Sequence, residues 1–111
     1  MSVRDMVKAA QLEMRKDDLP PSRARELLVQ LSSLYGNCLD EVREADHAYA
    51  VILLKFLDSD EAASRAKIRA ETSLEYLRKT EASNTLKLVL ESIRSLKVML
   101  RSIDEEMRLA R

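Results

Sequence analysis

The sequence has very few of the residues that make tight turns. Its 111 residues include one glycine, Gly36, and two prolines, the adjacent Pro20 and Pro21. Tight β-hairpin turns depend on glycine or asparagine at positive φ. The scarcity of glycine therefore argues against a fold built from hairpins and many-stranded sheets. Alanine, leucine, glutamate, lysine and arginine dominate instead, a composition typical of long helices.

Other shortages narrow the possible functions. One glycine cannot form a glycine-rich phosphate loop. The single cysteine, Cys38, cannot form a disulfide within the chain, which is typical of a reducing cytosol. The longest apolar run, 48–54, is far too short to span a bilayer, and residues 1–8 lack the apolar core of a signal peptide. We therefore expect a cytoplasmic protein without a membrane segment.

Large side chains are also scarce. The chain has four aromatic residues and no tryptophan, and its length is near the lower end for a self-sufficient core. Elongated helices shared between subunits need fewer large side chains than a compact globule does. We expect one helical domain over residues 1–111.

The clearest pattern is an apolar series that runs from 24 to 56 in steps of three and four, which we call the first seam. Such a heptad series predicts one amphipathic helix about 50 Å long. Gly36 occupies an outward position and the phase of the series continues past it, so we expect an unbroken helix, with a local break at Gly36 as the alternative. The first seam comprises Ala24, Leu28, Leu31, Tyr35, Cys38, Val42, Ala45, Tyr49, Ile52 and Phe56.

A second apolar series, the second seam, runs from 86 to 110 with the same spacing. Before residue 82 it gives way to an offset stripe that begins at Ala63, and Thr72 with Glu75 fits a capping box, so the helix is expected to restart at 72–73. The second seam comprises Leu86, Val89, Ile93, Leu96, Leu100, Ile103, Met107 and Ala110.

These patterns predict an all-α fold with four helices, over 1–17, 21–57, 60–71 and 73–110. The two long ones form an antiparallel hairpin with coiled-coil or bundle packing, and the short first helix packs across it. Leucines beside both seams make the apolar face wider than a two-stranded seam needs, so we expect self-association into a homo-oligomer. The residues predicted to pack helices within or between chains are Leu28, Leu31, Tyr35, Val42, Tyr49, Ile52, Phe56, Leu86, Val89, Ile93, Leu96, Leu100, Ile103 and Met107.

Catalytic and metal-binding patterns are weak. Cys38 belongs to the first seam, and His47 lies about 13 Å further along the same helix, too far for a nucleophile pair. Glu44 and His47 have the Glu-x-x-His spacing of di-iron bundles, but both fall on the outward face, whereas such ligands point into a core. We therefore expect no enzyme, no metal site and no cofactor.

Basic residues recur along the last helix. Residues 1–63 hold 8 Lys/Arg and 12 Asp/Glu, whereas residues 64–111 hold 11 and 7. Lys87, Arg94, Arg101 and Arg108 repeat every seven residues, about 10.5 Å apart, and this basic ladder can follow a polyphosphate backbone. The alternative is an ordinary solvated face, because Glu91 and Glu105 stand four residues from Lys87 and Arg101.

A second group, which we call the second basic group, contains five cations and one tyrosine between them: Arg65, Lys67, Arg69, Tyr76, Arg78 and Lys79. An aromatic ring beside cations is typical of surfaces that stack single-stranded bases. Tyr76 can stack on a base in this way, or it can pack against the neighbouring helix.

The order of these features resembles the small helical proteins of phage recombination modules, in particular the T4-type recombination mediator. The matching features are an acidic and apolar helix, the basic segment 64–70, then Tyr76 and a long C-terminal helix. That family carries a Lys-Ala-Arg-Leu type motif implicated in single-stranded DNA contact. By resemblance, Lys67 and Arg69 take its two basic positions, although Ile68 and Ala70 stand where the motif has alanine and leucine.

The resemblance implies a non-catalytic, ring-forming oligomer that holds single-stranded DNA while a recombinase loads. Our leading hypothesis is accordingly a homo-oligomeric accessory protein of phage or mobile-element type that binds single-stranded DNA. The alternative is a helical protein-interaction module, an adaptor, assembly chaperone or inhibitor that binds a host or phage protein and no nucleic acid.

Overall fold

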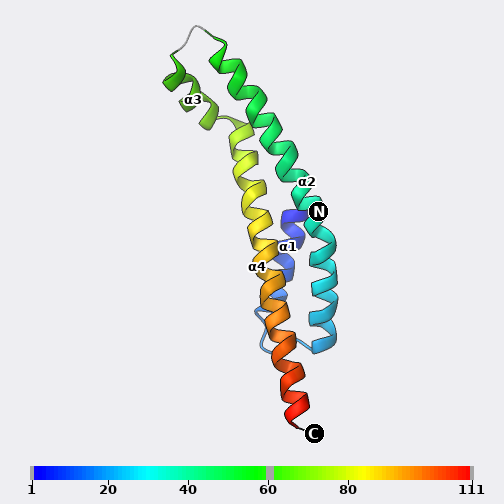
Figure 1. The fold of residues 1–111 in the computed structure, drawn as a ribbon. Coiled ribbons are helices and arrows are strands. Elements are labelled where there is room, and N and C mark those ends of the chain that lie inside the picture. Colours follow the sequence, from blue (N-terminus) through cyan, green and yellow to red (C-terminus); the bar gives the residue numbers. More distant parts are fainter. Residues whose placement is uncertain (1, 60–61, 111) are drawn as a thin grey trace. The chain divides into compact units, whose positions relative to one another are not determined.

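The protein is all-α. The computed structural model describes residues 2–59 and 62–110, and this part of the chain forms four helices (Figure 1): α1 (Val3–Met14), α2 (Pro21–Leu57), α3 (Ala63–Glu71) and α4 (Leu74–Leu109). The predicted fold class is confirmed. The bounds of α2 coincide with the prediction, whereas α1 ends at Met14 rather than at residue 17. The predicted start of the third helix at 60 lies outside the described residues.

The chain divides into two compact units. The first unit comprises Met1–Asn37 and Lys87–Arg111, and the second comprises Cys38–Leu86. Both α2 and α4 contribute one segment to each unit, and the two segments within a unit run antiparallel (Figure 1). The expected helical hairpin is therefore present, and one additional short helix completes each unit.

Three helices enclose the core of the first unit. Its largest fully buried side chains are Val7 of α1, Leu27 and Leu31 of α2, and Val89 and Leu96 of α4. The amide of Gln11 donates a hydrogen bond of 3.3 Å to the buried hydroxyl of Ser92, which joins α1 to α4.

Ion pairs also link the helices of the same unit at its surface. The guanidinium of Arg23 on α2 donates two hydrogen bonds to the carboxylate of Glu13, one of them 2.8 Å long. Arg25 on α2 lies 3.7 Å from Asp104 on α4. The short first helix therefore packs against the hairpin, as predicted.

The core of the second unit is made of small side chains. Its buried residues are Cys38 and Ala45 of α2, Ala66 and Ala70 of α3, and Ala82 and Thr85 of α4. Burial raises the pKa of the Cys38 thiol, consistent with a small apolar packing role. The larger Tyr49, Ile52 and Phe56 are only partly buried.

The helix ends follow local chemistry. The hydroxyl of Ser2 accepts a hydrogen bond of 3.1 Å from the Asp5 amide and so caps α1. Pro21 begins α2, where its missing N–H costs nothing. No described residue has a positive φ, and α2 continues through Gly36, so the alternative of a break there is not found.

The expected restart between α3 and α4 is present, but its cap differs from the prediction. Ser73, not Thr72, caps α4, because the Ser73 hydroxyl accepts a hydrogen bond of 3.2 Å from the Tyr76 amide. The Thr72 hydroxyl instead donates a hydrogen bond of 2.9 Å to the carbonyl of Arg69 at the end of α3.

The periodicity of the two seams was predicted correctly, but not every residue assigned to them is buried. Leu27, expected beside the first seam, is fully buried, whereas Leu28 is only partly buried, because α1 covers that flank. In α4 the buried line includes two hydroxyl residues, Thr85 and Ser92. Met107, assigned to helix packing, is 57% exposed, so the described part of the chain does not bury it.

Candidate nucleic-acid interface

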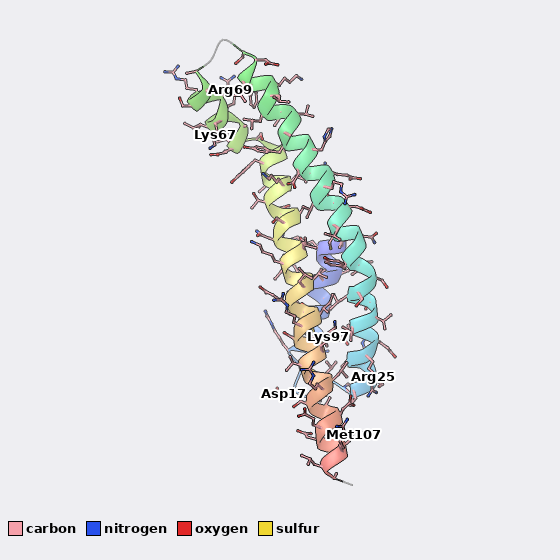
Figure 2. The ribbon with its side chains drawn as sticks, viewed as in Figure 1. Asp17, Arg25, Lys67, Arg69, Lys97 and Met107 are labelled. Carbon is pink, nitrogen blue, oxygen red and sulfur yellow. The ribbon has the colours of Figure 1, made fainter. Side chains whose placement is uncertain are left out.

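Helix α3 presents three cations on the surface of the second unit. Ala66 and Ala70, one turn apart, are fully buried and fix the inner face of this short helix. Arg65, Lys67 and Arg69 are consequently exposed; Figure 2 shows Lys67 and Arg69 on α3. In the described part of the chain, Arg65 and Lys67 form no ion pair.

A shallow hollow runs along α3. It has a volume of about 350 Å³ and is lined by Arg65, Ile68, Arg69 and Thr72. These positions follow one another by three, one and three residues, so they share one face of the helix. Ile68, which lines the hollow together with the two arginines, is 62% exposed. Two arginines beside an apolar side chain can hold an oxyanion and the carbon skeleton attached to it.

The end of a helix ordinarily repels anions, because its last carbonyls carry partial negative charge. In α3 these carbonyls already have donors. The carbonyl of Arg69 accepts hydrogen bonds from the Thr72 hydroxyl and amide, and that of Ala70 accepts them from the Ser73 hydroxyl and amide. This hydrogen bonding reduces the obstacle to an anion beside Arg69.

Arg69 also contacts an aromatic ring. Its guanidinium carbon lies 5.7 Å from the centroid of the Phe56 ring, near the end of α2. At this distance the ring attracts the cation. Phe56 therefore orients Arg69, a role that its place in the first seam did not predict.

The remaining members of the second basic group are engaged within the unit. Arg78 donates hydrogen bonds of 3.1 and 3.4 Å to Glu41 and Glu44 of α2. The ammonium of Lys79 lies 4.5 Å from the centroid of the Tyr49 ring. Tyr76 packs on Tyr49 with 5.4 Å between ring centroids, so it takes the predicted alternative of packing against the neighbouring helix.

The basic ladder lies on the first unit. Lys87, Arg94, Arg101 and Arg108 are all exposed on α4. Among the described residues, the expected pairs of Lys87 with Glu91 and of Arg101 with Glu105 do not form within 4.0 Å. The structure thus keeps the ladder exposed to solvent.

The other side chains that could bind a metal or take part in catalysis do not cluster in the described part of the chain. Glu44 and His47 are exposed, as their outward position predicted, and Glu44 is bound to Arg78. Over residues 2–59 and 62–110, no three His, Cys, Asp or Glu side chains come together as a metal site. No helix in that part of the chain is long and apolar enough to cross a membrane.

Sequence reasoning missed Ile68 and Thr72 as lining residues of the hollow. Their spacing from Arg65 contained the signal, since residues three, four and seven apart share a helix face. The contacts of Tyr49 and Phe56 with cations had no such signal, because they join separate helices.

Comparison with known protein families, curated proteins and solved structures finds no match to this chain. The resemblance to recombination mediators accordingly rests on the residues alone.

Proposed function

We propose that this chain is a non-enzymatic, self-associating accessory protein that binds single-stranded DNA through α3. The supporting observation is the pair Arg65 and Lys67, two exposed cations without an acidic partner in the described part of the chain, beside the hollow that Arg69 completes. Arg78 and Lys79 contribute less to binding, since Glu41, Glu44 and the Tyr49 ring already hold them.

The chemistry of α3 favours the phosphate backbone over the bases. Its cations can contact phosphates, and Ile68 offers an apolar surface to a sugar or a base face. Cationic grooves that follow the backbone hold single strands without reading their sequence. Binding is therefore expected to be independent of sequence and to weaken with salt.

Self-association is part of the proposal because three cations bind DNA weakly. Several copies on one strand combine their contacts and gain affinity without any new contact. By resemblance, the protein partner of such an assembly is a recombinase, and its source is a phage or mobile element.

The test is a titration of a labelled single-stranded oligonucleotide, followed by fluorescence anisotropy at about 50 and 200 mM salt. We expect Arg65→Ala/Lys67→Ala to weaken binding at least tenfold. The slope of log affinity against log salt should fall by about 1.4, which corresponds to about 0.7 for each lost phosphate contact.

The matched control is Lys8→Ala/Arg15→Ala, which removes one lysine and one arginine that are exposed on the first unit. This variant should bind within about twofold of the unchanged protein, apart from the general effect of two lost charges. No binding at 50 mM salt, or equal losses in the two variants, would refute the proposal.

A second candidate is a protein-interaction module, an adaptor, assembly chaperone or inhibitor. Leu74 and Leu77 at the start of α4 are 79% and 53% exposed, and such leucines favour a protein partner. Pull-down from the native host with and without nuclease separates the two. A partner that survives nuclease, and that Arg65→Ala/Lys67→Ala also retains, supports this second function.

A further inference from the structure

The outward face of α2 becomes apolar in its last turns. Val51, Leu54 and Leu57 are 51%, 61% and 42% exposed, and Ala50 lies beside them. The opposite face of the same helix carries the residues that pack within the second unit: Ala45, Tyr49, Ile52 and Phe56. The described part of the chain therefore covers one side of this segment and leaves the other in solvent.

Charged groups stand at the two ends of this face. Arg43 precedes the apolar residues, with the polar His47 next to them, and Asp58 follows them. The Asp58 amide donates a hydrogen bond of 2.9 Å to the Leu54 carbonyl, so Asp58 keeps the helical register. We call the face formed by Arg43, His47, Ala50, Val51, Leu54, Leu57 and Asp58 the outer stripe; its residues are exposed and recur by three or four.

The outer stripe has Arg43 at one end and Asp58 at the other, about 22 Å apart along the helix, with the apolar residues between them. A stripe with this order is complementary to itself when one copy is turned end for end. In that antiparallel register, Val51 of one copy faces Leu54 of the other. Asp58 of each copy then faces His47 of its partner and lies about one turn from the partner's Arg43. A parallel arrangement would place each Arg43 beside another Arg43.

We propose that the outer stripe is a two-fold contact between two copies of this chain, with the paired helices antiparallel. The contact specifies the self-association part of the proposed function and does not depend on DNA binding. Each stripe offers four apolar side chains, fewer than a permanent dimer buries, so association is reversible, with a dissociation constant on the order of tens of micromolar.

Sedimentation of the DNA-free protein between about 5 and 500 µM tests the contact. The unchanged chain should shift from monomer to dimer across this range, and Leu54→Ser should weaken dimerisation at least tenfold. The matched control is Leu12→Ser, which alters a leucine of similar exposure, 63% against 61%, on α1 of the first unit. It should dimerise like the unchanged chain.

A charge exchange tests the antiparallel register. Arg43→Glu and Asp58→Arg should each weaken dimerisation about fivefold, because each places like charges opposite one another. Arg43→Glu/Asp58→Arg should restore it, since the exchanged charges again face each other.

A chain that stays monomeric at about 500 µM would overturn the proposal. The proposal would also be overturned if Arg43→Glu/Asp58→Arg dimerised no more tightly than the single variants, because the stripe would then contact some other surface. Circular dichroism of each variant verifies that the helices are intact. Loss of dimerisation with unchanged binding of DNA by the monomer would separate this contact from the α3 surface.

Discussion

The two units differ in what they bury. The first encloses leucines and valines between three helices, and it holds all of the largest fully buried side chains. The second buries alanines, a cysteine and a threonine, and it leaves its aromatic residues, valines and isoleucines partly or largely exposed. Burying a leucine or valine stabilises a fold by about 1.5–3 kcal/mol, well above what an alanine supplies. The first unit is therefore the stable anchor of the hairpin.

The second unit uses its side chains for contacts rather than for a core. Small residues let α3 approach the long helices closely, and Arg69 and Lys79 lie over the rings of Phe56 and Tyr49. The cations of α3 and the outer stripe both belong to this unit. In the function that we propose, the second unit supplies the binding surfaces and the first unit supplies the larger core.

The largest expected effect distinguishes the two cores. Leu31→Ala should lower the free energy of unfolding by about 2–5 kcal/mol, because it leaves a cavity in a fully buried site. Ile52→Ala, at a half-buried site of the second unit on the same helix, should lower the free energy of unfolding by less than half of that amount. Urea unfolding of both variants measures the difference, and equal losses would show that the cores do not differ.

An intermediate effect is expected at Gly36, on the helical segment that belongs to the first unit. A Cβ added there meets no atom within 4 Å, and the residue is already helical. Gly36→Ala should therefore stabilise the protein by about 0.5–1 kcal/mol. A higher thermal midpoint with unchanged helix content is the expected result, and a lower midpoint would mean that α2 needs flexibility at this point.

The smallest effect concerns the ion pair that holds α1 in the first unit. The hydrogen bonds from Arg23 lower the pKa of Glu13 below its ordinary value. The pair therefore stabilises the fold at neutral pH, and this contribution is lost as the pH falls through the glutamate range, near about 4.3, to the lowered pKa. Arg23→Gln should have a lower thermal midpoint than the unchanged chain at neutral pH, and the two midpoints should converge on acidification.

Scans at pH 7 and pH 3 measure this convergence. A gap between the two proteins that stays constant with pH would show that Arg23 acts through the packing of its side chain and not through its charge.

Much of the fold was predictable because it depends on periodicity. The proline before Ser22 predicted the start of α2, and the heptad phase predicted that the helix continues through Gly36. Both signals act within one helix. Ser92 was not predicted to be buried, and Leu27 was predicted only to widen the apolar face, because their burial within the chain depends on where α1 lies. Ser92 and Thr85 are tolerated in the core because each hydroxyl donates to the carbonyl four residues earlier.

The candidate site was predictable only in part, for a similar reason. The exposure of Arg65, Lys67 and Arg69 follows from the buried Ala66 and Ala70 on the opposite side of α3. The engagement of Arg78 with Glu41 and of Tyr76 with Tyr49 depends on the register between two helices. No pattern along one helix carries that register.

Hydrogen exchange followed by mass spectrometry, with and without a single-stranded oligonucleotide, tests most directly whether one unit anchors and the other binds. Exchange should be slowest at 24–31 and 89–96 in the free protein, and DNA should slow exchange chiefly at 63–71. A DNA complex that protects the first unit and leaves α3 unchanged would contradict this division of roles.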